Sequence, residues 1–179
     1  DRKVIIANAI LFNKEANRLN ITYHQSTPII RTMAQLQAAQ SMTQVTNTDC
    51  ANKHDGGRGF DCSSYIGFIL YNSGLYGTAR PSTSAIAGQI GSVFEVISAE
   101  EAKPGDIALS SSHVVLYMGG GKVSEAAGHG QKLADTFNHS KPSIMSGSYR
   151  FLRLKNIDKN KHTINLTSLT GGTSSNSES

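Results

Sequence analysis

The residue types with the clearest potential for chemistry lie in segment 59–65, which contains the run Phe-Asp-Cys-Ser-Ser. Asp61 precedes an apolar run that predicts a helix over 62–73. A cysteine in the first turn of a helix lies among backbone N–H groups without helical partners, at the positive end of the helix dipole. This position stabilises a thiolate and supplies donors to an oxyanion. Cys62 is therefore a candidate nucleophile, and a buried structural cysteine is the alternative.

A candidate general base lies further along the chain. The run Pro-Gly-Asp-Ile-Ala over 104–108 is followed by His113 at the start of an apolar stretch that predicts a strand. If this strand packs against the helix that begins at Cys62, the imidazole faces the sulfur. An imidazole that takes the thiol proton gives a thiolate–imidazolium pair, which is the working state of a cysteine nucleophile.

Glu125 is the candidate residue for orienting that imidazole. If glycines 119–121 form a three-residue loop, Met118 pairs with Lys122 and Glu125 shares a sheet face with His113. A two-residue loop would place Glu125 on the opposite face. A carboxylate bonded to the ring would fix its tautomer and stabilise the imidazolium. The alternative for Glu125 is a solubilising charge on an edge strand.

Two other uses of the cysteines remain open. Cys50, His54, Cys62 and His113 could be arranged as zinc ligands, although their spacing lacks a Cys-x-x-Cys pair. A disulfide between Cys50 and Cys62 would block the nucleophile. We expect Cys62 to be free in the active form, and we expect neither a metal nor a cofactor.

Helical patterns precede strand patterns along the chain, an order that predicts an α+β fold. Helical spacing of apolar residues covers 2–19, Pro28 can begin a second helix over 28–42, and a short helix is expected near 83–90. Strands are expected over 93–97, 106–109, 114–118, 122–126 and 149–154. His24, His139 and His162 show no partner in the sequence, and we expect them to be solvated.

The motifs at these segments resemble the NlpC-like cell-wall cysteine peptidases. They are Phe-Asp-Cys-Ser at a helix start, Pro-Gly-Asp before a strand, and His-Val-x-x-Tyr-x-Gly-x-Gly. The resemblance covers roughly residues 46–154. It implies a papain-like α+β fold, with N-terminal helices packed on an antiparallel sheet of about five strands. It also implies a peptidoglycan hydrolase that cleaves an amide bond of the cell-wall stem peptide.

The resemblance assigns roles to individual residues. Cys62 corresponds to the nucleophile, His113 to the base, and Glu125 to the third polar residue, which is usually His in the family and Glu in the related CHAP peptidases. The family often has Tyr where this chain has Cys50.

Four further residues are candidates for substrate binding. Asp61 and Ser63 flank the nucleophile, Arg80 falls where the family has a wall of the cleft, and His129 could line the cleft. His129 could also replace Glu125 as the residue that orients the base.

Three functions remain open from the sequence. The first is a stem-peptide endopeptidase. The second is an N-acetylmuramoyl-L-alanine amidase, because the pair Ser63-Ser64 is closer to a branch of phage lysins of that type. The third is a wall-binding module that kept the fold and lost catalysis. The sequence does not decide which amide bond is cut, or whether the source is bacterial or phage.

Composition limits the partners. The formal net charge is +4 and the basic residues are scattered, which argues against nucleic-acid binding. No run of 18 apolar residues is present, so we expect no membrane insertion. We expect a monomer whose partner is bacterial peptidoglycan. We also expect it to be secreted and wall-associated, or part of a phage particle or lysin, although no signal is visible.

We expect three parts along the chain. Residues 1–45 form an N-terminal helical segment and residues 46–156 form the catalytic core. Residues 157–179 form a flexible tail or linker rich in Ser, Thr and Gly, which suggests a connection to a further domain.

Overall fold

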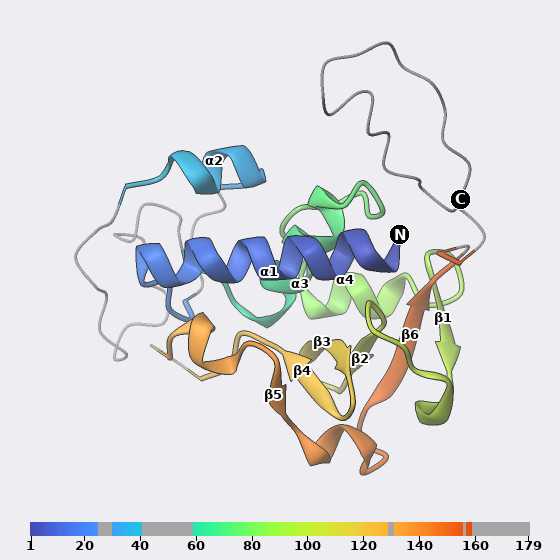
Figure 1. Ribbon diagram of the computed structural model, residues 1–179. Helices are drawn as coiled ribbons and strands as arrows, with labels where there is room; N and C mark the ends of the chain where they lie inside the picture. The colour runs from blue at the N-terminus through green and yellow to red at the C-terminus, as the bar shows by residue number, and fades with distance from the viewer. Residues whose placement is uncertain (25–29, 41–58, 129–130, 156, 159–179) are drawn as a thin grey trace.

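Helices cover one face of an antiparallel sheet (Figure 1). The computed structural model describes residues 1–24, 30–40, 59–128, 131–155 and 157–158. The α-helices are α1 (Arg2–Leu19), α2 (Met33–Ala38), α3 (Cys62–Asn72) and α4 (Thr83–Gly88). Short 3-10 turns are η2 (Ala99–Glu101), η3 (Leu133–Thr136) and η4 (Pro142–Met145). The strands are β1 (Phe94–Ile97), β2 (Ile107–Leu109), β3 (Val114–Gly119), β4 (Lys122–Ser124), β5 (His139–Ser140) and β6 (Arg150–Leu154).

The six strands have the order β1-β6-β2-β3-β4-β5, and neighbouring strands pair antiparallel. The predicted α+β class is confirmed, with one strand more than expected. That strand, β5, has only two residues, which is too short to produce an alternating pattern in the sequence. β6 enters between β1 and β2, so the chain is not a simple meander.

Alternating side chains give the sheet two apolar faces. Ile107, Leu116 and Leu152 belong to the main core beneath the helices, together with α1 and α3 residues. Their neighbours Val115 and Phe151 belong to a smaller cluster on the other face, which is covered by the turn η4 through Ile144. The residues that carry candidate chemistry are therefore positioned by strands that are buried on both sides.

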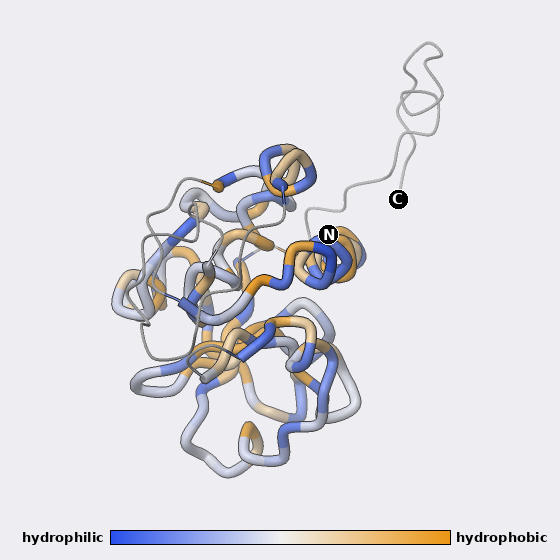
Figure 2. The backbone as a smooth tube through the Cα atoms, turned by 90° about the vertical axis from the view of Figure 1, so that its left-hand side faces the viewer, coloured by the Kyte–Doolittle hydropathy of each residue, from blue (hydrophilic) through white to orange (hydrophobic). Residues whose placement is uncertain are grey.

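The N-terminal helix α1 packs directly against the helix that begins at Cys62, and the prediction of a helix over 2–19 is confirmed. Figure 2 looks along α1 and shows hydrophobic and hydrophilic positions around its circumference. On the buried side, the Phe12 ring packs edge-on against Phe60, Tyr65 and Phe68, with centroid distances of 5.0, 4.9 and 5.4 Å. Because edge-on aromatic pairs add stability beyond area burial, α1 holds α3 in place.

The second helix is shorter than expected. Thr32 is extended and caps α2, because its hydroxyl accepts a hydrogen bond from the Gln35 amide at 3.1 Å while the Gln35 side chain accepts one from the Thr32 amide at 3.1 Å. This reciprocal cap fixes the helix start at Met33. The predicted helix over 28–42 is therefore wrong over residues 30–32 and 39–40, and its two ends lie outside the described residues.

The β3–β4 hairpin contains both a two-residue turn and a bulge. Leu116 pairs with Ser124, but Gly119 pairs with Lys122, and the register shifts between these pairs. Gly120 and Gly121 have φ values of 63° and 76°, as a type I′ turn requires. The expected three-residue loop is wrong. The extra residue in the bulge nevertheless restores the predicted alternation of side chains, so Glu125 lies on the same face of the sheet as His113.

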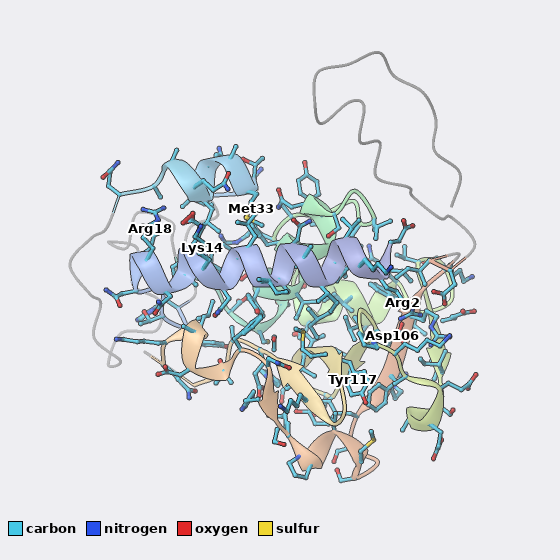
Figure 3. The ribbon with its side chains drawn as sticks, in the orientation of Figure 1. Arg2, Lys14, Arg18, Met33, Asp106 and Tyr117 are labelled. Atoms are coloured by element: carbon cyan, nitrogen blue, oxygen red, sulfur yellow. The ribbon has the colours of Figure 1, made fainter. Side chains whose placement is uncertain are left out.

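A buried carboxylate ties the N-terminus to the sheet. The Asp106 side chain is fully buried and accepts hydrogen bonds from Arg2 Nη1 at 2.9 Å, Arg153 Nη2 at 2.9 Å and the Lys103 amide at 2.9 Å. Figure 3 shows Arg2 and Asp106 close together at the N-terminal end of α1. The Asp106 carboxylate therefore links three parts of the fold: α1, β6, and the turn that precedes β2.

The same network reaches past the end of β6. Ile157 is buried in the main core, and Asp158 pairs with Arg2 at 2.7 Å. The division of the chain at residues 45 and 156 stays a prediction. Among the described residues, no helix is long and apolar enough to cross a membrane.

We predict that Asp106→Ala lowers the free energy of unfolding by about 3 kcal/mol, because it leaves the largely buried Arg153 guanidinium without its anion and leaves Arg2 with only the exposed Asp158. Urea denaturation measures this change. Asp158→Ala is the matched control, since its carboxylate also binds Arg2 but is 48% exposed, and it should cost less than about 1 kcal/mol. Equal losses in the two variants would contradict the structural role of Asp106.

Candidate active site

The first turn of α3 places Cys62 at a fixed position. Asp61 caps the helix: its Oδ1 accepts from the Ser64 amide at 2.9 Å, and Ser64 Oγ accepts from the Asp61 amide at 2.9 Å. This reciprocal cap makes Cys62 the first helical residue, as predicted. The side chain is largely buried, with 7% of the residue exposed, and its thiol is free.

His113 faces this cysteine from the sheet. α3 packs against β3, which begins one residue after His113. The imidazole interacts with the Cys62 thiol, and this interaction contributes to the raised pKa of His113. About 20% of the His113 side chain is exposed, so the pair is accessible from solvent. The structure thus brings together the two residues that the sequence proposed as nucleophile and base. Cys50 lies outside the described residues.

Glu125 contacts the other side of the imidazole. Its Oε1 lies 2.6 Å from His113 Nε2, and the residue is only 1% exposed. Because Nε2 is engaged by the carboxylate, Nδ1 is the ring nitrogen left for the sulfur. The backbone of Glu125 is held by Thr136, whose Oγ1 donates to the Glu125 carbonyl at 2.6 Å. His129, the alternative orienting residue, lies outside the described residues.

Two residues that the sequence analysis did not select complete the surroundings of the carboxylate. His139 Nε2 lies 2.5 Å from Glu125 Oε2, and Lys141 Nζ lies 3.0 Å from Oε1 and 3.1 Å from Oε2. The expectation that His139 is solvated without a partner is wrong. No local pattern signals either residue, since both come from β5 and the turn after it.

The prediction for His24 is also wrong, since His24 is fully buried with its Nδ1 2.8 Å from Thr22 Oγ1. The Tyr23 and His24 segment runs beside Phe60, two residues before the nucleophile. His162 lies outside the described residues.

The electrostatics favour a carboxylate–imidazolium pair. Burial lowers the pKa of His113, but hydrogen bonds and charge interactions with Cys62 and Glu125 outweigh burial and raise the pKa to about 9. Burial raises the pKa of Glu125, but hydrogen bonds from His113, Lys141 and His139 and the Lys141 charge lower it to about 2. Near neutral pH, His113 is therefore a cation and Glu125 an anion.

Tyr65 of α3 is a buried residue whose hydroxyl interacts with the charge of Glu125. This residue is 1% exposed, and its hydroxyl is bonded to Ser124, next to Glu125. Burial is the main reason that the pKa of Tyr65 is raised, so the phenol stays neutral. A neutral phenol contributes no counter-charge to the carboxylate.

The predicted substrate-binding residues have structural contacts of their own. Ser63 is 4% exposed and its hydroxyl donates to Asp61 Oδ1 at 3.4 Å. The Arg80 guanidinium lies 3.9 Å from the centroid of the Phe60 ring and donates to the Gly59 carbonyl at 2.6 Å. Arg80 thereby orders the chain just before the nucleophile. Substrate contact by Asp61, Ser63, Arg80 and His129 stays a prediction.

A polar groove of about 340 Å³ is lined by residues of α4, of the segment just before His113 and of the start of β6. Ser110 forms part of its wall, and the Ser110 hydroxyl accepts a hydrogen bond from the His113 amide at 3.1 Å. The polar side chains that line the groove are those of Thr83, Ser84, Ser110, Ser111, Ser148 and Arg150. These groups can bind carbonyl, hydroxyl or carboxylate groups of a polar substrate.

The zinc alternative has no support among the described residues, where no group of His, Cys, Asp or Glu is arranged to hold a metal. Two of its four ligands, Cys50 and His54, lie outside those residues. The described geometry instead matches nucleophilic chemistry: a sulfur, an imidazole within reach of its proton, and a carboxylate that fixes the ring.

Comparisons with known proteins agree with this fold. The NlpC/P60 family model matches residues 43–149. A structure of a variant of RipA, a resuscitation promoting factor interacting protein, has a TM-score of 0.50 and 15% identity, covering 86% of this chain and 65% of that one. RipB from Mycobacterium tuberculosis, described as a peptidoglycan hydrolase, has a TM-score of 0.48 and 18% identity, covering 86% of this chain and 67% of that one. No curated protein matches the sequence.

The chain thus spans slightly less than two thirds of the RipA structure, and that likeness concerns the fold. Together with the family match, it confirms the predicted papain-like α+β architecture.

We predict a pH-dependent contribution of His113 to stability. Because the folded-state pKa of about 9 lies above the unfolded value of about 6.5, the contribution is complete below about pH 6.5 and is lost as the pH rises through 9. The difference in unfolding free energy between the wild type and His113→Gln should fall by about 3 kcal/mol over this window. Denaturant titrations at pH 6 and pH 9.5 measure it, and a constant difference would refute the cationic state of His113.

Proposed function

Because the chain belongs to the NlpC/P60 family, we propose that it is a cysteine peptidase that hydrolyses an amide bond in the stem peptide of bacterial peptidoglycan. The observation that supports this proposal is the chain of contacts from Cys62 through His113 to Glu125. It joins a free thiol, a base and an orienting carboxylate, which are the parts that amide hydrolysis by a thiol requires.

The proposed reaction proceeds through an acyl-enzyme. The cationic His113 already holds the proton of the thiol, and the Cys62 sulfur attacks the carbonyl carbon of the amide. The backbone N–H of Cys62, at the start of α3, donates to the developing oxyanion. His113 then gives its proton to the leaving amine. A water molecule, deprotonated by His113, attacks the thioester, and the carboxylic acid product and the free thiol are released.

Glu125 has the same task in each step. Its hydrogen bond to Nε2 keeps the ring in the orientation that presents Nδ1 to the sulfur, and its charge stabilises the imidazolium. Every proton in this cycle is carried by groups of the chain or by water, so the reaction needs no cofactor.

The polar groove lined in part by Ser110 is the proposed place for part of the substrate. Stem peptides are rich in carbonyl and carboxylate groups, and the serine hydroxyls and Arg150 of the groove provide matching donors. Because the Ser110 hydroxyl accepts a hydrogen bond from the His113 amide, a peptide in the groove would contact the segment that carries the base.

An amidase that cuts the bond between sugar and peptide is the second candidate function. The pair Ser63-Ser64, which resembles that of phage lysins of this type, favours it. Both candidates use the same sulfur, base and carboxylate. Either activity places the protein at the cell wall, as a secreted enzyme or a phage component.

We predict that Cys62→Ala reduces hydrolysis of purified peptidoglycan by at least about 1000-fold, since removing the nucleophile of a triad leaves little catalysis. The measurement is the rate of release of soluble fragments. Glu125→Gln should cost less, because the nucleophile and the base remain. Equal thermal stability of Cys62→Ala and the wild type serves as the control for folding. Full lysis by Cys62→Ala would remove this residue from the mechanism.

We also predict that the soluble products carry a new free amine and a new carboxylate within the stem peptide. Mass spectrometry of digested muropeptides of known structure measures this. Products in which the whole peptide is separated from the sugar would support the amidase instead. Binding to peptidoglycan without any product would support a non-catalytic wall-binding module.

A further inference from the structure

The carboxylate of Glu125 has more partners than the orientation of one imidazole requires. His113 occupies Oε1 at 2.6 Å and His139 occupies Oε2 at 2.5 Å. Lys141 Nζ bridges the two oxygens, at 3.0 and 3.1 Å. The three sequence motifs that resemble the family end before β5 and contain neither His139 nor Lys141, although the family match extends to residue 149.

Burial gives these contacts their strength. Glu125 is 1% exposed, and the side chains of Lys141 and His139 are 22% and 34% exposed. Charges removed from water interact more strongly and are screened less by salt. A buried carboxylate also needs compensating partners to remain ionised. An ammonium group is a cation at any pH at which an imidazole normally titrates, so its compensation persists.

We infer that Lys141, supported by His139, is a positioning residue for His113: it fixes both oxygens of Glu125 and offsets part of the negative charge that the carboxylate exerts on the ring. This inference rests on the proposed function. In that reaction His113 must both take a proton and give it up. A carboxylate acting alone on the ring would hold the proton too firmly, and a carboxylate free to rotate would not orient the ring.

The groups that face Glu125 come from three elements. His113 lies just before β3, His139 comes from β5, and Lys141 comes from the turn after β5. α3 contributes Tyr65, which is neutral, and Cys62, which acts through His113. Among the described groups that bond to the carboxylate, Lys141 is the one with an ammonium charge. Its removal therefore changes the charge around Glu125 most.

The test is an NMR titration of the His113 imidazole, assigned by the signal that disappears in His113→Gln. In Lys141→Met, the pKa of His113 should rise by about one unit, because the cation that binds both oxygens of Glu125 is lost while Glu125 stays ionised. In Glu125→Gln, the pKa should fall. Lys141→Arg should restore the wild-type value, since a guanidinium also bonds both carboxylate oxygens.

Two comparisons complete the design. Lys122→Met removes an exposed lysine of neighbouring β4 and should leave the His113 midpoint unchanged. Lys141→Gln, which keeps a donor without the charge, should raise the midpoint as Lys141→Met does, and it is used if the methionine variant does not fold.

An unchanged or lowered His113 midpoint in the Lys141 variants overturns the inference. A purely structural role of Lys141 would reduce thermal stability and leave the midpoint in place. The titration uses no substrate, so it is independent of the proposed function. That function fails if Cys62→Ala still hydrolyses peptidoglycan, whatever the titration shows. If both hold, Lys141→Met should lower kcat more than it changes KM, and Lys141→Arg should recover kcat.

Discussion

The contact between the thiol at the start of α3 and the imidazole at the start of β3 is the interaction on which the site depends. It forms only if a helix and a strand from distant parts of the chain meet at their ends. The Asp61–Ser64 cap fixes where the helix begins, and a change of one residue would rotate Cys62 away from the ring by about 100°. Local capping chemistry thus controls a long-range contact.

The packing behind α3 maintains this contact. Phe12 of α1 packs against Phe60 and Tyr65, which precede and follow the nucleophile in the sequence. Arg80 donates a hydrogen bond to the Gly59 carbonyl. Asp106 in turn fixes the N-terminal end of α1 to the sheet. The N-terminal helix is therefore part of the same core as the candidate site, although the family match begins at residue 43.

The carboxylate of Glu125 shows how a buried charge can be both stable and useful. Three donors compensate it, and only one of them is the imidazole that takes part in the proposed reaction. The short strand β5 is the structural reason for this arrangement. It pairs with β4 at the sheet edge and brings His139 to the carboxylate, while Lys141 follows in the next turn.

The sequence by itself determined the helix start at Cys62 and the strand that follows His113, and it supplied the three candidates of the proposed triad, with His129 open as an alternative to Glu125. These signals are local, because caps, apolar periodicity and short motifs act within a few residues. The sequence could not determine the turn of the β3–β4 hairpin. A bulge and a two-residue turn together place Glu125 on the sheet face that was expected from a three-residue loop. Nor could it reveal His139 and Lys141. Their partners are decided by strand pairing at the sheet edge, and a two-residue strand leaves no pattern in the chain. Tertiary structure alone brought these side chains to one buried carboxylate.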